Sequence, residues 1–239
     1  MLNVVEKLAL HKLWDLLLWL LLIVFISYFV AKIHKKTEIN SKIFIFVTWK
    51  QLNTHFMVEV YVEKFGGASV NSASAVRNVI SILQREEKIR IVVISAMGKT
   101  TNSLEKIVDL WHRYNKFNEE EFLLSKNYHK SIIQDLFENN SCIDIALNML
   151  EKTFEELKQV LFGLNPNDYD FLYDKIVSYG ERLSTGIISL YMTSLDLNHR
   201  LVPAQELIKT DNSYRGAQVD WKQTEKAVKE KFKILFTLF

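Results

Sequence analysis

The residues best suited to chemistry in this chain form a glycine loop, Lys64-Phe65-Gly66-Gly67-Ala68-Ser69-Val70. The loop follows a β-type run, Val58 to Val62, and precedes a helical pattern. Paired glycines lack a Cβ and permit positive φ, so successive backbone N–H groups can converge on an anion. Lys64 adds a full positive charge, and Ser69 leads into a helix start. These residue types favour a phosphate-binding loop, with a Gly-Gly turn beside a solvated lysine as the structural alternative.

A second loop of similar composition follows the next strand. Ile89 to Ser95 is a β-branched run typical of a buried parallel strand. After it come Ala96 to Asn102, and a helix is expected from about Ser103. Gly98-Lys99-Thr100 resembles the tail of a P-loop, but the first glycine of that pattern would fall at Val93, inside the strand, so the P-loop interpretation fails. Both loops follow strand ends and are rich in glycine, lysine and hydroxyl groups, so they can still meet across one crevice.

A carboxylate and a hydroxyl, Glu181 and Ser184, open a later helical segment. Taken alone, they favour helix capping over ligand binding.

The elements that must position these residues alternate between strand and helix from Val58 onward, which predicts an α/β fold with a parallel sheet. Ser72 is a candidate N-cap for the helix that ends near Glu86. Helices are also expected over 122–137, 142–162, 169–179, 181–195 and 224–232, and strands over 201–204 and 234–239. Pro203 indicates an edge strand or an irregular strand end. In the 142–162 segment, a core-facing stripe is predicted from Ile145, Leu150, Phe154, Leu157 and Leu161.

Residues 1–56 differ from the rest of the chain. Leu16 to Ile26 is an unbroken apolar run, and residues 13–31 form a candidate membrane-spanning helix, at the short end of the roughly 17 to 25 residues required. Basic residues between Lys32 and Lys36 would place the remainder in the cytoplasm. A start codon assigned too far upstream, with translation beginning at Met57, is the open alternative to a membrane anchor.

Composition excludes several classes of protein. The net charge is +2 with both signs interspersed, so nothing indicates nucleic-acid binding. Cys142 is the single cysteine, which excludes an intrachain disulfide and fits a reducing compartment such as the cytoplasm. The histidines have no ligand spacing, and we predict no protein-ligated metal site.

Four sequence blocks in order identify a family resemblance. They are Lys-Phe-Gly-Gly-Ala-Ser-Val at 64–70, Ser-Ala-Met-Gly-Lys-Thr-Thr-Asn at 95–102, Ser-Tyr-Gly-Glu-Arg-Leu-Ser at 178–184 and Thr-Asp-Asn-Ser-Tyr-Arg at 210–215. Together they resemble the N-terminal part of the aspartate kinase family, from about Met57 to the C-terminus. The resemblance implies the amino acid kinase fold, a carbamate kinase-like parallel-sheet sandwich.

The resemblance also implies an activity and a set of site residues. ATP would donate its γ-phosphoryl group to the side-chain carboxylate of L-aspartate, giving 4-phospho-L-aspartate and ADP, the first step toward lysine, threonine and methionine. Mg²⁺ would arrive with the nucleotide, held by phosphate oxygens and water. Lys64 would contact the transferring group, and Thr101 and Glu181 would bind aspartate, Glu181 through its ammonium group. The phosphates would be lined by Lys64, Phe65, Gly66, Gly67, Ser69 and Ser95. Asn102 and Ser184 are further candidates for residues of the site.

One departure from the family qualifies this expectation. Aspartate kinases continue with a glycine-rich segment whose arginine and aspartate complete the nucleotide site, and then with regulatory ACT domains. We therefore expect residues 57–239 to be a C-terminally truncated kinase domain that is inactive alone. A non-catalytic fragment, a membrane-tethered binding subunit and a sibling acyl or carbamate kinase are the alternatives, although Thr101 and Glu181 argue against the last. A truncated sheet would also expose a strand edge and favour homo-oligomers.

Overall fold

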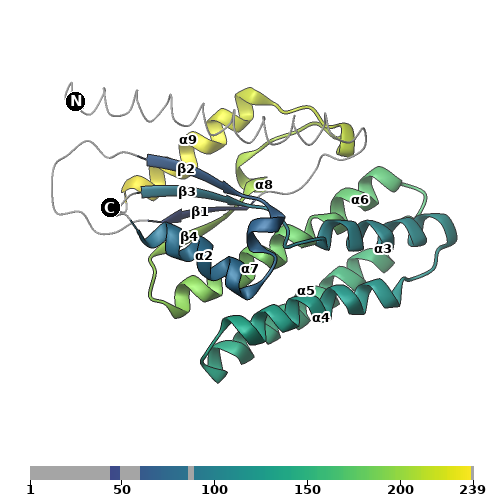
Figure 1. Cartoon of the computed structure of the whole chain (residues 1–239). Helices are drawn as coiled ribbons and strands as arrows, with labels where there is room; N and C mark the ends of the chain where they lie inside the picture. Colours follow the sequence, from purple (N-terminus) through teal and green to yellow (C-terminus); the bar gives the residue numbers. More distant parts are fainter. Residues whose placement is uncertain (1–43, 49–59, 86–88, 238–239) are drawn as a thin grey trace.

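A computed structural model describes residues 44–48, 60–85 and 89–237 of the chain. Its sheet has four strands in the order β2-β3-β1-β4 (Figure 1). Their bounds are β1 Phe44–Thr48, β2 Val60–Phe65, β3 Ile89–Ile94 and β4 His199–Pro203. The edge position predicted for the strand with Pro203 is confirmed, because β4 is the last strand in that order.

The sheet is mixed rather than wholly parallel. β2 and β3 pair in parallel, with Val62 opposite Ile91, as the sequence predicted. β1 is antiparallel to both β3 and β4 and lies between them. The segment Phe-Ile-Phe-Val-Thr is rich in aromatic and β-branched residues, which suit a strand. It falls in the region that sequence analysis assigned to the N-terminal extension, so at least these residues belong to the sheet.

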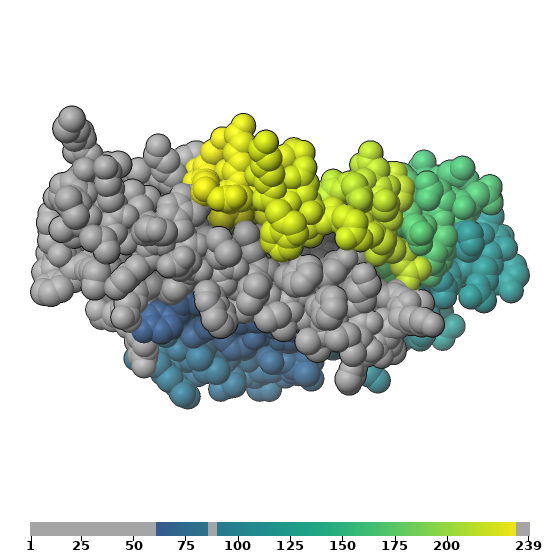
Figure 2. Space-filling view, turned by 90° about the horizontal axis from the view of Figure 1, so that it is seen from above, coloured from purple at the N-terminus to yellow at the C-terminus, as the bar shows by residue number. Residues whose placement is uncertain are grey.

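Helices form most of the described structure (Figure 1). Their bounds are α2 Ala73–Gln84, α3 Thr100–Tyr114, α4 Glu119–Leu136, α5 Asn140–Gly163, α6 Tyr169–Val177, α7 Tyr179–Ser194, α8 Ala204–Leu207 and α9 Trp221–Thr237. Two short 3₁₀ helices are η1 Gly67–Val70 and η2 Tyr214–Gly216. α7 packs on β1, β3 and β4, whereas α9 packs on α8 and is exposed on one face of the molecule (Figure 2).

Local signals explain where several helices begin and what they bury. The Ser72 hydroxyl accepts a hydrogen bond from the Ala75 amide at 3.2 Å, which confirms the predicted N-cap of α2. On α5, the predicted stripe residues Leu150, Phe154, Leu157 and Leu161 are completely buried. Ile145 is 57% exposed, so the prediction that Ile145 faces the core is wrong. It precedes Leu150 by five residues, a rotation of about 140° away from that residue at 100° per residue.

Several elements also differ from expectation in their bounds or type. The helix expected from about Ser103 begins at Thr100. The expected 169–179 helix ends at Val177, and α7 begins at Tyr179 after a single residue, Ser178. The predicted C-terminal strand from Ile234 is wrong, because the backbone of α9 continues to Thr237. A β-type run of residues thus extends a helix that has already nucleated, since each added residue gains a hydrogen bond.

The candidate membrane-spanning segment, residues 13–31, lies outside the described residues. Within the part of the chain that the structure describes, no helix is both long enough and apolar enough to cross a membrane.

Candidate functional site

The two loops that follow β2 and β3 are in direct contact, an arrangement that the sequence allowed. The Gly98 amide donates to the Gly67 carbonyl at 3.0 Å, and the Ser95 amide donates to the Phe65 carbonyl at 3.1 Å. A Cβ added at Gly67 would lie 2.7 Å from the Ala96 carbonyl oxygen. Glycine is therefore required at position 67 because the second loop approaches its backbone. Positive φ is not the reason, because in these two loops only Gly98 has it, at +53°.

Lys64 lies at the end of β2 with its ammonium group over the first loop. The side chain is exposed, and its Nζ atom lies 3.2 Å from the position that a Cβ on Gly66 would take. The loop then turns into η1, where the Ser69 amide donates to the Gly66 carbonyl at 2.9 Å. Phe65 is half-buried and Ser69 is exposed. An exposed lysine ammonium group thus lies beside a glycine backbone, an arrangement that suits an anionic ligand.

Helices α3 and α7 carry the residues predicted to bind aspartate. Neither helix has a side-chain hydrogen bond at its N-cap, Lys99 or Ser178, whereas α2, α4, α5 and α6 each have one. The first amides of a helix have no partner inside the helix, and they carry a partial positive charge. Thr101 is half-buried and Asn102 is exposed in the first turn of α3.

Glu181 reaches from the first turn of α7 to the second loop. Its side chain is 2% exposed, and Oε1 accepts a hydrogen bond from the Ala96 amide at 3.3 Å. Oε2 is buried and has no hydrogen-bond partner among the described residues. Burial raises the pKa of the Glu181 carboxyl to about 8, against the lowering effect of backbone hydrogen bonds from Glu181 itself and Ala96. The carboxylate therefore connects α7 to the loop and is more than a cap of its own helix.

The remaining predicted residues divide into two kinds. Ser95, directly after β3, is half-buried at the contact between the loops. The buried Ser184 hydroxyl donates to the Glu181 carbonyl at 3.0 Å, so in this structure it serves the backbone of α7. Sequence analysis missed Gly180, where a Cβ would lie 2.9 Å from the Ala96 Cβ. A glycine beside a predicted ligand residue was the available signal for this close approach.

The fourth sequence block, residues 210–215, is not at the two loops. It packs on α6, where the Arg215 guanidinium lies 4.3 Å from the Tyr173 ring centre and 5.2 Å from that of Tyr169. The same guanidinium lies 3.7 Å from an Asp170 carboxylate oxygen. Stacking and charge together fix this segment against the helix.

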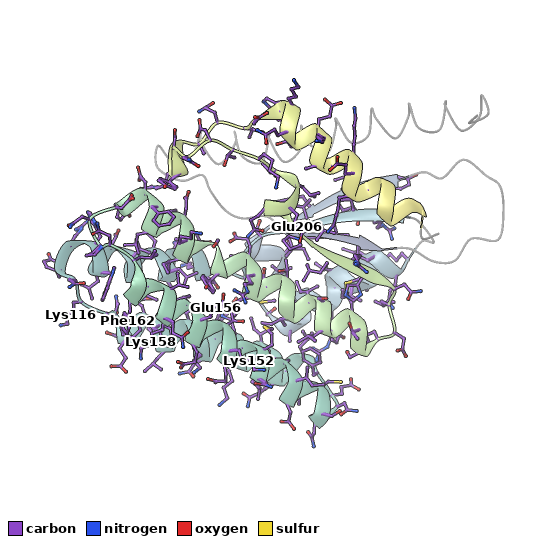
Figure 3. The ribbon with its side chains drawn as sticks, turned by 180° about the vertical axis from the view of Figure 1, so that it is seen from behind. Lys116, Lys152, Glu156, Lys158, Phe162 and Glu206 are labelled. Carbon is purple, nitrogen blue, oxygen red and sulfur yellow. The ribbon has the colours of Figure 1, made fainter. Side chains whose placement is uncertain are left out.

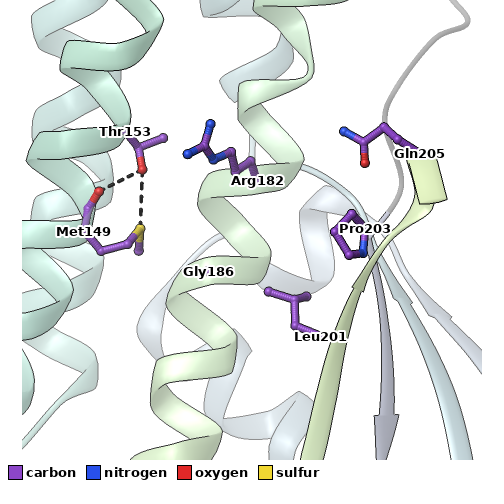
Figure 4. Close-up of a pocket in the computed structure, with 7 residues that line it drawn as sticks. All are labelled: Met149, Thr153, Arg182, Gly186, Leu201, Pro203 and Gln205. Carbon is purple, nitrogen blue, oxygen red and sulfur yellow. Dashed lines mark hydrogen bonds between the residues drawn. The ribbon is translucent and has the colours of Figure 1, made fainter. Parts of the chain in front are cut away.

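A pocket of about 470 Å³ lies between α5, α7 and the β4–α8 segment (Figure 4). Its lining residues are Met149, Thr153, Arg182, Gly186, Leu201, Pro203 and Gln205. Arg182 forms a bidentate pair with Glu156, at 2.6 Å for each contact. The Thr153 hydroxyl donates to the Met149 carbonyl at 2.7 Å. None of the predicted site residues lines this pocket, and we assign no function to it.

No group of three or more His, Cys, Asp or Glu side chains in the described part of the chain could hold a metal ion. Our expectation that the protein itself ligates no metal stays a prediction.

Comparisons with known proteins agree with the resemblance. Residues 59–235 match the amino acid kinase family. Chloroplastic aspartokinase 1 of Arabidopsis thaliana is 31% identical over 207 residues, covering 78% of this chain and 34% of the relative. The aspartokinase of Chlamydia muridarum is 30% identical, covering 66% and 33% respectively. The chain therefore spans about a third of the length of these relatives.

Solved structures show the same fold. E. coli aspartokinase III in complex with aspartate and ADP matches with a TM-score of 0.60 at 21% identity, covering 73% of this chain and 38% of that one. The same enzyme in complex with lysine and aspartate also gives a TM-score of 0.60. The amino acid kinase fold expected from the sequence is thereby confirmed, although the described sheet is mixed rather than wholly parallel.

Proposed function

Because the chain belongs to the amino acid kinase family, we propose that it carries the aspartate-binding and phosphate-binding part of an aspartate kinase. The reaction transfers the γ-phosphoryl group of ATP to the side-chain carboxylate of L-aspartate and gives 4-phospho-L-aspartate and ADP. Two relatives with 31% and 30% identity are aspartokinases. The observation that carries the proposal is the convergence of the Lys64 loop, the Ala96 loop and buried Glu181 at one contact.

The phosphate side of the site is the first loop. The Lys64 side chain is exposed, and we expect its ammonium group to follow the phosphoryl group from ATP to aspartate. Phosphoryl transfer depends mainly on positioning the reactants and on neutralising the charge of the phosphoryl group. A lysine beside glycine amides can supply both. Gly66, Gly67, Ser69 and Ser95 would line the phosphates. An aspartate carboxylate oxygen attacks the γ-phosphorus, the bond to the ADP oxygen breaks, and no proton has to move.

The aspartate side of the site is the junction of α3 and α7. Thr101 and Asn102 would face a substrate carboxylate at the uncapped start of α3. Glu181 would receive the substrate ammonium group on its unpartnered Oε2. An adjacent positive charge favours the ionised carboxylate, so binding should lower the pKa of Glu181 from its raised value of about 8. We therefore expect aspartate binding near pH 7 to release a proton.

Mg²⁺, when bound with ATP, would neutralise charge on the β- and γ-phosphates. In this proposal the kinase part is cytoplasmic and serves the first step toward lysine, threonine and methionine.

Because the chain alone is expected to be inactive, the first test is aspartate binding by calorimetry, and aspartate-dependent ADP release by the full chain is the second. The kinase variants apply if release is observed. Lys64→Ala should lower turnover by at least about a hundredfold, the range found when one charge-stabilising group is removed. Lys116→Ala is the matched control, because this exposed lysine lies at the far end of the α3–α5 helices (Figure 3). Glutamate and carbamate serve as competing substrates, and a preference for either would contradict the assignment to aspartate.

Calorimetry separates catalysis from binding. Aspartate binding that Glu181→Gln abolishes, without ADP release by the wild type, would identify a non-catalytic binding unit and overturn the kinase activity of this chain. Absence of both binding and turnover would overturn the proposed function altogether.

A further inference from the structure

Helix α4 contacts both loops through two consecutive side chains, Tyr128 and His129. Tyr128 reaches the space between the loops, where its hydroxyl donates to the Asn71 carbonyl at 2.8 Å. Asn71 directly follows η1. A Cβ on Gly98 would lie 2.5 Å from the Tyr128 Oη atom, so the same hydroxyl is pressed against the second loop. Tyr128 thus spans the ends of the first and second loops.

His129 is completely buried and holds the start of α3. Its Nδ1 atom lies 2.8 Å from the Ser125 carbonyl. A carbonyl only accepts, so Nδ1 carries the proton, and in the neutral ring Nε2 is an acceptor. Burial keeps the ring neutral by lowering its pKa to about 4. The Thr100 hydroxyl carries a single hydrogen, which lies between two acceptors, the Met97 carbonyl at 2.6 Å and His129 Nε2 at 3.3 Å.

α4 is itself fixed to its neighbours, so it can act as a rigid support. It packs on α2, α3 and α5. The Arg77 guanidinium of α2 donates to the Leu136 carbonyl at the end of α4, at 3.3 Å. Ion pairs connect Glu121 to Lys106 of α3 and Lys126 to Glu151 of α5. Each neighbour therefore limits the rotation of α4 about its axis.

We propose that Tyr128 and His129 are positioning residues, Tyr128 setting the spacing of the two loops and His129 orienting Thr100 and hence Thr101 toward aspartate. The substrate part of this inference rests on the proposed function. The loop-spacing part rests only on the contacts of Tyr128 and Gly98. Neither residue contacts the reacting atoms in this scheme; both act through the backbone that does.

Hydrogen exchange of the unliganded full chain tests the first residue without any need for activity. Tyr128→Phe keeps the ring and removes the hydroxyl. We expect amide exchange in segments 66–71 and 95–100 to rise about twofold to tenfold, the range that corresponds to the loss of one neutral hydrogen bond. Tyr114→Phe is the matched control, because Tyr114 is 69% exposed. Unchanged exchange in both loops of Tyr128→Phe would overturn the role of Tyr128.

A pair of substitutions separates the two nitrogens of His129. His129→Asn can keep a donor for the Ser125 carbonyl, and His129→Gln can keep an acceptor for Thr100. If His129 orients Thr100, the Asn variant should raise the KM for aspartate about threefold to tenfold with little change in kcat, and the Gln variant should restore it. Equal KM values in both variants, with lowered thermal stability, would mean a structural role only.

Exchange at 95–100 is measured in the same His129 variants. Faster exchange in the Asn variant than in the Gln variant supports the orienting role even if the wild type shows no turnover, in which case only the proposed function fails. Equal exchange in the two variants would overturn that role.

Discussion

Replacing Gly67 with alanine probes the contact on which the candidate site depends. A Cβ at this position would lie 2.7 Å from the Ala96 carbonyl oxygen and 3.0 Å from that of Gly98. Both neighbours are backbone atoms, so neither can rotate away. Gly66 offers a matched control, because its added Cβ would meet only the Lys64 Nζ atom, at 3.2 Å, at the end of a flexible side chain.

The two substitutions differ in one physical effect. Neither glycine has a positive φ, so both variants gain the same stabilisation of about 0.4–1 kcal/mol from a less flexible unfolded chain. That gain cancels in the comparison. Overpacking remains at position 67 and typically costs about 1–3 kcal/mol. We therefore expect Gly67→Ala to be less stable than Gly66→Ala by about 1–3 kcal/mol.

Urea unfolding followed by circular dichroism measures this difference. With a slope of about 2 kcal/mol per molar urea, the midpoint of Gly67→Ala should lie about 0.5–1.5 M below that of Gly66→Ala. Equal midpoints would refute the close approach of the two loops, and with it the geometry from which the site is argued.

Three further predictions concern Glu181, Arg215 and the Arg182–Glu156 pair. The pKa of Glu181 is raised in the folded state to about 8 from 4.5, so between these pH values the folded state holds a proton that the unfolded state has lost. The free energy of unfolding should therefore fall as pH rises from about 4.5 to about 8. Glu181→Gln should remove this slope in unfolding measured across that range, and an unchanged slope would assign it to another group. Arg215→Lys keeps the charge but loses the planar stacking on Tyr173. Amide hydrogens of residues 209–220 should therefore exchange faster, while exchange in segment 66–71 stays the same. Equal exchange rates for 209–220 in wild type and variant would contradict the anchoring role of Arg215. Both side chains of the Arg182–Glu156 ion pair are about half exposed. A double-mutant cycle with alanine should therefore give a coupling energy below about 1 kcal/mol. A larger coupling energy would indicate that water screens this ion pair less than the exposure of its side chains implies.

Features that depend on near neighbours in the chain were predictable. The Ser72 cap needs only a hydroxyl three residues before an amide, and the structure contains it. The parallel pairing of β2 with β3 follows from two β-branched runs separated by one helix. Leu150, Phe154 and Leu157 repeat at helical spacing and are buried.

Features that depend on distant segments were not predictable in this way. β1 lies within a stretch whose most visible signal was an apolar helix, and its antiparallel place in the sheet requires partners from both β3 and β4. Tyr128 and His129 occur in an ordinary amphipathic helix, where an aromatic and a histidine are typical of core packing. Only the approach of α4 to Gly98 and Thr100 gives them another role.

The sequence by itself indicated a candidate phosphate loop, because lysine charge, glycine backbones and a helix-start hydroxyl are properties of short segments, and the candidates for aspartate came only from the family resemblance. Only the tertiary structure decided how these segments meet. The Glu181 carboxylate accepts the amide of Ala96 across 85 positions of the chain, and Gly67 is required by the carbonyl of Ala96. Such contacts follow from the packing of whole elements, and local spacing carries no information about them.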